Sequence, residues 1–204
     1  MNAKKLLIIT AGIAIAMMTG TAANAVIVGQ NLGASAYSAS SSYCAQWAPP
    51  KAFDGDYTYV PWHTGDPDPT PGKTQWNAGQ SNGWIEVNLG QVYDISGMVL
   101  LRHPMAPTAA NQDIWISSTG PIGGARAGAT KIWSVDQSTA TDFTLTFAPG
   151  TMAQYVQVQT SYDAGWTNWM DIYISASPVP EPSSLLALSA GLLPLLCLRR
   201  RKKA

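Results

Sequence analysis

Short runs of alternating apolar and polar residues fill the middle of this chain and constrain its fold more than any other feature. Clear alternation occurs at residues 84–89 (WIEVNL), 143–147 (FTLTF) and 155–159 (YVQVQ). Successive side chains of a strand point to opposite faces of a sheet, so this period predicts half-buried β-strands. No stretch of useful length between residues 26 and 175 has the apolar spacing typical of a helix. The sequence therefore predicts an all-β fold.

Turn-forming residues divide the same region into short elements. Further strands are predicted at residues 98–102, 113–117, 131–135 and 169–175, separated by clusters of Gly, Pro, Asn and Asp. Many short strands of this kind favour an antiparallel sandwich or barrel, and about 150 residues suit a single core. Residues 57–73 and 105–110 break the pattern and are predicted to be surface loops, where binding sites are usually placed.

The first 25 residues are interpreted as a secretory signal peptide. Lys4 and Lys5 precede an apolar run at residues 6–18, and Ala23-Asn24-Ala25 fits the small-residue pattern of a cleavage site after Ala25. The alternative is a membrane-spanning anchor. The apolar run is shorter than the ~20 residues that a bilayer requires, which favours the signal peptide.

Residues 176–204 form a second segment that differs from the body of the chain. Val179, Pro180, Glu181 and Pro182 come first, followed by an apolar stretch at residues 185–198 and a basic cluster at residues 199–203. This order resembles the PEP-CTERM sorting signal of Gram-negative bacteria that make exopolysaccharide. The resemblance implies that an exosortase, a membrane cysteine protease, cleaves the chain near the Pro-Glu-Pro and delivers the body to the cell surface or matrix. The alternative is a plain C-terminal membrane anchor, and both interpretations export the body and limit membrane contact to the tail.

Charge and aromatic content narrow the ligands of the body, residues 26–175. Five Lys and Arg stand there against eleven Asp and Glu, a net charge of about −6. A body without clusters of Lys or Arg cannot neutralise phosphates, which excludes nucleic acid and leaves cations and neutral ligands. All eight Trp and all eight Tyr of the chain lie in this region. Because so many rings exceed the need of one core, some of them are expected to be exposed.

The chain has two cysteines, and only Cys44 lies in the body, since Cys197 lies in the apolar tail. The body therefore cannot form an internal disulfide. Cys44 is expected to be a buried small hydrophobic residue, with pairing to another molecule as the alternative.

Four short motifs occur in the body of the chain. They are ASAYS at residues 34–38, KAFDGD at 51–56, TQWN at 74–77 running into GWIEVNLG at 83–90, and WMDIY at 169–173. Together they resemble the discoidin, or coagulation factor 5/8 C-terminal-type, domain, which includes many bacterial carbohydrate-binding modules. The resemblance spans residues 34–174 and implies a galactose-binding-like fold, an antiparallel jelly-roll β-sandwich of eight strands with its termini close together. This chain departs from the family in lacking the disulfide that often joins the ends, and in the insertion at residues 57–73.

The resemblance also implies a structural Ca²⁺ site. Its ligands in this sequence would be the carbonyl of Ala52 and the side chains of Asp54, Asp56, Thr74 and Asp171. A hard cation takes six to eight oxygen ligands, and Gly55 permits the sharp turn that would aim them. Asp171 stands where the family more often has Glu, one methylene longer. The alternative is that residues 54–56 are merely a polar turn.

A sugar site is implied by the same resemblance. Family members that bind sugars use a His and a Trp from the loop after the Asp-Gly-Asp turn, with an Arg at the end of a later strand. Trp62, His63 and Arg102 lie at comparable positions, and Tyr57, Tyr59, Trp166 and Trp169 are further candidates. An aromatic face would pack on a pyranose while His or Arg fixes its hydroxyls. Strand alternation instead assigns Trp84 and Trp115 to the core.

The sequence offers little for catalysis. It has neither a Gly-x-Ser-x-Gly nor a His-Glu-x-x-His motif, and His63 and His103 lie 40 positions apart. Glu86, the only Glu of the body, is expected to face solvent from the middle of a strand. We therefore expect a non-enzymatic, exported surface or matrix protein that binds extracellular polysaccharide. The alternative is a structural or adhesion protein that binds protein partners and has no sugar site.

Overall fold

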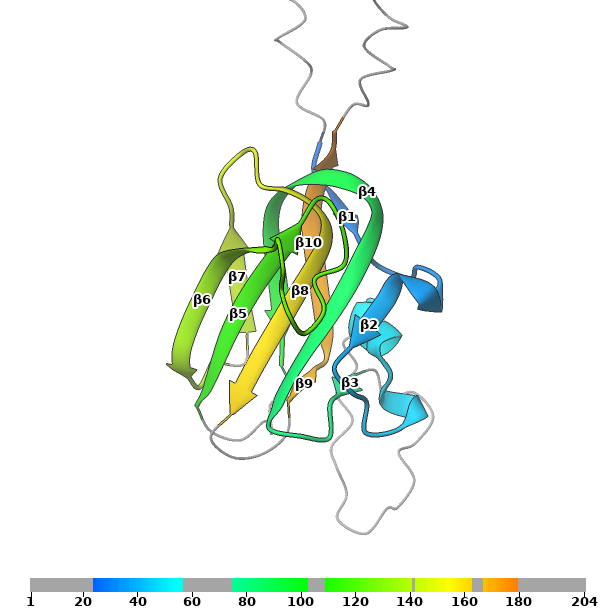
Figure 1. Cartoon of the computed structure of the whole chain (residues 1–204), viewed down its shortest axis with the longest axis vertical. Coiled ribbons are helices and arrows are strands. Elements are labelled where there is room, and N and C mark those ends of the chain that lie inside the picture. Colours follow the sequence, from blue (N-terminus) through cyan, green and yellow to red (C-terminus); the bar gives the residue numbers. More distant parts are fainter. Residues whose placement is uncertain (1–23, 57–74, 103–108, 141, 163–166, 180–204) are drawn as a thin grey trace, which may run out of the picture.

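The computed structural model describes residues 24–56, 75–102, 109–140, 142–162 and 167–179 (Figure 1). These residues form strands and short 3-10 helices only. The 3-10 helices are η1 (Ala34–Ala36), η2 (Ala45–Trp47) and η3 (Pro49–Phe53). The strands are β1 (Val26–Val28), β2 (Tyr37–Ala39), β3 (Trp76–Asn77), β4 (Asn82–Leu101), β5 (Ala110–Ser117), β6 (Thr130–Ser138), β7 (Asp142–Thr146), β8 (Met152–Tyr162), β9 (Asn168–Trp169) and β10 (Asp171–Pro178). The all-β prediction is confirmed.

Strand β4 joins the two layers of the sandwich. Its first half pairs with β2 and β8, and its second half pairs with β7 and β10. Strands β5 and β6 extend the first layer beyond β8, and β1 extends the second beyond β10. All these pairings are antiparallel, as expected. The sequence predicted two separate strands at residues 84–89 and 98–102; instead one strand arches between the layers (Figure 1). Gly90 lies in the arch at φ +83°, a conformation that glycine adopts without strain.

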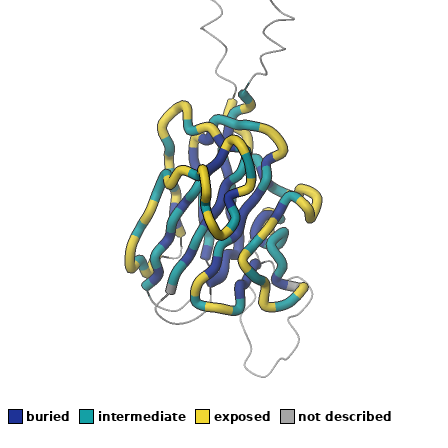
Figure 2. Tube along the Cα trace, in the orientation of Figure 1, coloured by how far each residue is buried: buried dark blue, intermediate teal, exposed yellow. Residues whose placement is uncertain are grey.

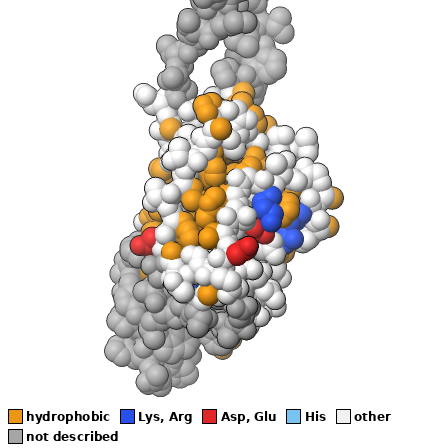
Figure 3. Space-filling view, turned by 90° about the vertical axis from the view of Figure 1, so that its left-hand side faces the viewer, with side chains coloured by type: hydrophobic (Ala, Val, Ile, Leu, Met, Phe, Trp, Pro, Cys, Tyr) orange, Lys and Arg blue, Asp and Glu red, His pale blue; other side chains and the backbone are white. Residues whose placement is uncertain are grey.

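The core lies between the two layers and is built by every second residue of the central strands. Figure 2 shows this buried interior between more exposed edges and loops. The first layer contributes Ile85, Val87, Ile114, Ile116, Val156 and Val158, and the second contributes Met98, Leu100, Ile172 and Ile174. The period-two pattern is thus the pattern of one buried sheet face. Figure 3 shows hydrophobic side chains also gathered on the side where β6 and β7 lie.

The outer face of the first layer departs from the sequence prediction. The β5–β6 connection, residues 118–129, folds back over this face, and Ile122 within it is 3% exposed. Glu86 was expected to face solvent but is 3% exposed, because its carboxylate lies under this connection. Trp84 and Trp115 were expected in the core; instead they are half-buried on the same outer face. The assignment was wrong because both faces of this sheet are partly covered.

Hydrogen bonds to Glu86 hold the β5–β6 connection in place. Its Oε2 accepts from the backbone N–H of Ile122 at 3.1 Å and of Gly123 at 2.9 Å, and from Nε2 of Gln157 at 3.1 Å. Arg126 lies over the Trp115 ring, with its guanidinium carbon 5.3 Å from the ring centroid. A carboxylate that accepts three hydrogen bonds can be buried, because the bonds replace its hydration.

The first and last strands of the body lie side by side. Val26 pairs with Ala176 and Val28 with Ile174, so the two ends of the domain are close together, as the family resemblance implied. Strand β10 continues to Pro178, beyond the expected boundary at residue 175. Residues 1–23 of the expected signal peptide and 180–204 of the expected sorting tail, with their two helices, lie outside the described residues. Within the described part of the chain, no helix has the length and apolar character needed to span a membrane.

Candidate functional site

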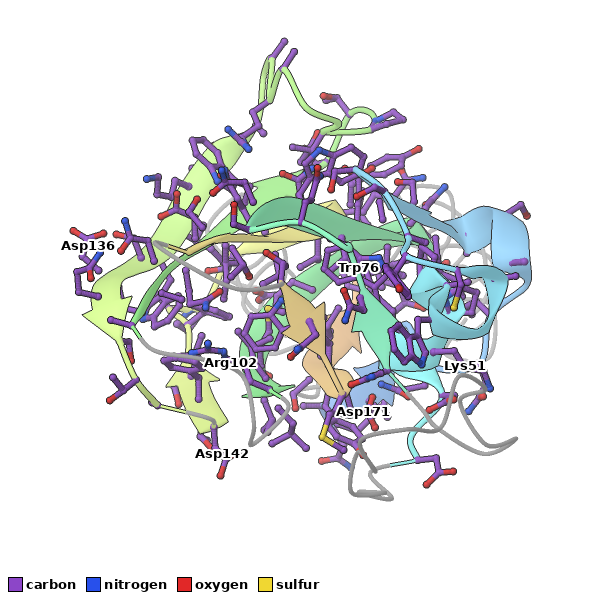
Figure 4. The ribbon with its side chains drawn as sticks, turned by 90° about the horizontal axis from the view of Figure 1, so that it is seen from below. Lys51, Trp76, Arg102, Asp136, Asp142 and Asp171 are labelled. Carbon is purple, nitrogen blue, oxygen red and sulfur yellow. The ribbon has the colours of Figure 1, made fainter. Side chains whose placement is uncertain are left out.

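One end of the sandwich, opposite the chain termini, carries most of the predicted site residues that the structure describes. Both ends of β4, the start of β10 and the β3–β9 pair meet at this end, which we call the loop end (Figure 1). In Figure 4, which views it from below, Arg102, Trp76 and Asp171 lie near the middle, with Asp136, Asp142 and Lys51 nearer the rim. Trp76 pairs with Trp169 and Asn77 with Asn168.

Asp171, the first residue of β10, has a fully buried carboxylate. Its Oδ1 accepts the backbone N–H of Ile172 at 2.9 Å, whereas no described donor lies within hydrogen-bonding distance of its Oδ2. Burial raises the pKa of Asp171, an effect partly offset by Tyr173, Ile172 and Gln30 and reinforced by the charge of Asp54. The same surroundings raise the pKa of Tyr173 to about 12, through burial first and then the neighbouring carboxylate of Asp171. Asp54 and Asp171 therefore lie close enough to influence each other.

Asp54 ends η3 and belongs to a tight turn beside Asp171. Its Oδ1 accepts the backbone N–H of Asp56 at 3.1 Å, and its Oδ2 lies 3.6 Å from Nζ of Lys51. Burial raises the pKa of Asp54, against the hydrogen bond from Asp56 and the charge of Lys51. Gly55 has φ +74°, which confirms the sharp backbone turn expected there. Asp54 and Asp56 thus form a polar turn, and the charge of Asp54 acts on Asp171.

Gln30 adds a further oxygen to this group, and no motif in the sequence indicated it. Its Nε2 donates to the carbonyl of Ile172 at 2.6 Å. Its Oε1 is buried with no described donor in reach, and it lies close to Gly55, where an added Cβ would be 3.4 Å away. Two buried acceptors without donors, on Gln30 and Asp171, are costly unless a cation or water satisfies them.

The predicted calcium ligands are therefore only partly assembled by the structure. Ala52 is buried in η3, Asp54 and Asp56 share one turn, and the charge of Asp54 helps to raise the pKa of Asp171. Thr74 lies outside the described residues. Among the residues that the structure describes, no group of three or more His, Cys, Asp and Glu side chains is arranged to hold a metal ion. Any cation here would depend on carbonyl and amide oxygens as well as on the two carboxylates.

Arg102, the predicted sugar-binding arginine, follows β4 directly and is 1% exposed. Its Nη1 donates to the carbonyl of Ala140 at 3.0 Å and of Ser138 at 3.4 Å, so the side chain braces the β6–β7 connection. The other sugar-site candidates, Tyr57, Tyr59, Trp62, His63 and Trp166, lie outside the described residues.

Trp169 was predicted to be available for ligand, which is wrong, because its side chain is fully buried. Its Nε1 donates to Oγ1 of Thr160 at 3.1 Å, and that hydroxyl donates to Oε1 of Gln112 at 2.7 Å. This chain of hydrogen bonds ties β9 to β8 and β5 beneath the loop end. Trp169 is a structural support of the site.

Cys44 and Tyr43, near the loop end, differ from or add to what the sequence predicted. Cys44 was expected to be buried and is only half-buried. Tyr43 is 55% exposed, the one aromatic among the exposed large hydrophobic side chains of the described residues. Its spacing to Trp47, four residues on, is the sequence feature that could have indicated a stacked pair.

The fold and this end of the molecule define an antiparallel β-sandwich domain that carries polar and aromatic side chains on its loops. The chain belongs to the F5/8 type C domain family, whose model matches residues 36–174. This confirms the resemblance to the discoidin-type domain. No curated protein sequence matches the chain.

Solved structures with the same fold include sugar-binding modules. Chitosan-binding module 1 of a chitosanase/glucanase from Paenibacillus sp. IK-5 is 21% identical with a TM-score of 0.54, over 73% of this chain and 98% of that one. Module 2 of that enzyme, in complex with chitotriose, is 23% identical with a TM-score of 0.54, over 72% and 97%. The family 32 CBM of C. perfringens NanJ, in complex with galactose, is 14% identical with a TM-score of 0.53, over 74% and 98%. At these identities the likeness establishes the shared fold.

Proposed function

We propose that this chain is a non-catalytic carbohydrate-binding protein that acts on the cell surface or in the extracellular matrix. The observation that carries the proposal is the F5/8 type C match over residues 36–174, in a fold shared with modules solved with galactose and with chitotriose. The acidic body, with a net charge of about −6 over residues 26–175, suits neutral or cationic polysaccharides and disfavours polyanions. Trp62, His63 and Arg102, with Tyr59 and Trp166, are the proposed sugar-binding residues.

Export and sorting complete the proposal. Residues 1–25 would direct secretion, and residues 176–204 would be recognised by an exosortase through Val179, Pro180, Glu181 and Pro182. The pairing of β1 with β10 supports this arrangement, because the start of β1 and the end of β10 lie together at the end opposite the loop end (Figure 1). A tail cut there would leave the loops directed away from the attachment point. Mass spectrometry of the exported protein tests this, since the proposal requires a C-terminus near Pro182.

A structural Ca²⁺ would fit the acceptors at the loop end. Asp54 and Asp171 would hold it together with the carbonyl of Ala52, Asp56 and Thr74, and the buried Oε1 of Gln30 is a further oxygen ligand. A bound cation would neutralise two adjacent carboxylates and satisfy oxygens that otherwise lack donors. It would stabilise the turn at residues 54–56 and so the start of the long loop that follows.

Binding to the polysaccharide of the producing bacterium tests the function directly. The purified full chain is mixed with that exopolysaccharide and with a glycan array, and Trp62→Ala is compared with the wild type. We expect the wild type to bind at least one glycan and Trp62→Ala to bind it more weakly. If the wild type binds neither the exopolysaccharide nor any glycan of the array, the protein is instead a structural or adhesion component.

A further inference from the structure

Tyr43 has the features of a binding platform that the predicted sugar site does not include. Its ring is 55% exposed, yet it stacks on Trp47, which is 2% exposed, with ring centroids 5.3 Å apart at 29°. One face of the tyrosine is therefore supported by the protein and the remaining surface meets solvent. An aromatic ring that is supported on one face and exposed on the other presents an apolar surface to a ligand without further rearrangement.

The backbone around Tyr43 is fixed by the neighbouring turn. The N–H of Tyr43 donates to the carbonyl of Asn77 at 2.8 Å, and Oγ of Ser41 donates to the carbonyl of Ala78 at 2.8 Å. Gly79 packs so closely that an added Cβ would lie 3.1 Å from the Tyr43 ring. A side chain held in this way loses little conformational entropy when a ligand binds.

The turn beside Tyr43 carries exposed amide groups and is itself braced. Gln80 and Asn82 are exposed, whereas the carbonyls of Gln80 and Ser81 accept hydrogen bonds from Thr167, which is fully buried. Side-chain amides supply both donors and acceptors, as sugar hydroxyls require. A supported ring beside a braced turn with exposed amides combines an apolar surface with a few polar groups.

The charge of this surface decides the class of sugar. Residues 40–48 and 77–83 contain no charged side chain, although the body as a whole is acidic. From these described residues a cationic amino sugar would gain no ion pair, and an anionic sugar would find no counter-charge. We propose that Tyr43, with Gln80 and Asn82, forms a subsite for an uncharged pyranose unit of a polysaccharide. This inference rests on the proposed function and narrows its ligand to neutral glycans at this position.

Affinity electrophoresis of the full chain tests the subsite. The gels contain a neutral galactan, a neutral β-glucan, cationic chitosan or anionic alginate. We expect at least one neutral polysaccharide to retard the wild type, and Tyr43→Ala to raise its Kd about tenfold, the effect of losing about 1.4 kcal/mol. Tyr43→Phe keeps the ring and should keep the wild-type Kd. Gln80→Ala leaves the stacked pair intact and should also weaken binding, so the subsite is tested even if Tyr43→Ala does not fold.

Met152→Ala is the matched control, because Met152 is a 40% exposed hydrophobic residue at the start of β8, opposite Asp94 in the sheet. Its Kd should equal that of the wild type. The subsite is refuted if Tyr43→Ala and Gln80→Ala both bind as the wild type does, if Tyr43→Phe loses as much as Tyr43→Ala, or if only chitosan or alginate retards the protein. No retardation of the wild type by any polysaccharide would refute the proposed function itself.

Discussion

Removal of the Glu86 carboxylate should release the β5–β6 connection from the outer face of the sheet. This carboxylate is 3% exposed and accepts two backbone N–H groups of the connection, from Ile122 and Gly123, and one side-chain N–H from Gln157. Glu86 lies 36 residues from Ile122 along the chain, so the contact is purely tertiary. Glu86→Ala removes all three acceptor interactions at once.

The loss of stability in Glu86→Ala depends on whether the β5–β6 connection stays on the sheet or lifts away. If the connection stays in place, buried N–H groups are left without acceptors, at about 1–3 kcal/mol each. If it lifts away, the burial of Ile122 is lost, which is worth about 1.5–3 kcal/mol, together with the charged hydrogen bonds. Because these contributions are coupled, we expect Glu86→Ala to lower the free energy of unfolding by about 3 kcal/mol. Glu86→Gln keeps an acceptor oxygen of the same reach and should cost about half as much.

Urea denaturation and amide hydrogen exchange together measure this effect. Exchange at Ile122 and Gly123 should accelerate in Glu86→Ala more than exchange in the core strands. Asp136→Ala is the control, since Asp136 is exposed on β6 and should change stability by less than about 0.5 kcal/mol. The reasoning is refuted if Glu86→Ala is as stable as Asp136→Ala and its Ile122 and Gly123 amides exchange as slowly as in the wild type.

Two further predictions concern the loop end and the contact between β4 and β7. Burial raises the pKa of Asp171, so the folded state binds this proton more tightly than the unfolded state, and in EDTA the wild type should lose stability as pH rises from about 4. Asp171→Asn should therefore be at least as stable as the wild type in EDTA at neutral pH. Adding CaCl₂ should raise the melting temperature of the wild type but not that of Asp171→Asn. If CaCl₂ changes both melting temperatures equally, the proposed ion is excluded. Gly97→Ala should cost about 1–3 kcal/mol in urea denaturation, because its Cβ would lie 2.6 Å from the Leu145 carbonyl oxygen. Gly33→Ala, with no atom near the added Cβ, should cost nothing, and similar values for both variants would contradict this reasoning.

Much of the fold was predictable because its pattern is local. The alternation at residues 84–89 and 155–159 identified strands that pair directly in the structure, with Ile85 opposite Val158. The Asp-Gly-Asp turn was also predictable, since a glycine between two acidic residues favours a sharp turn. What the pattern could not show was that residues 84–89 and 98–102 belong to one strand, because the arch at Gly90 depends on two layers closing around a shared core.

The candidate site was less predictable because its residues lie far apart along the chain. Asp54 and Asp171 were identified through family motifs, but the nearby oxygen of Gln30 has no such motif and reaches them only in the folded domain. Trp169 was a further candidate for the sugar site, although it is fully buried beneath the loop end. A tryptophan in a short strand has the same local sequence in either role, and its environment is set by strands far away in sequence.

By itself, the sequence determined that residues 36–174 form an antiparallel β domain of the discoidin type, because strand period, turn residues and family motifs are properties of neighbouring residues. Only the tertiary structure decided which faces are covered. Glu86 is buried and Trp84 is half-buried because a connection distant in sequence folds over them. Tyr43 remains exposed while one side of its ring packs against Trp47 and Gly79. Burial is a property of the whole packed molecule, and so is the choice between a residue that supports the fold and one that meets a ligand.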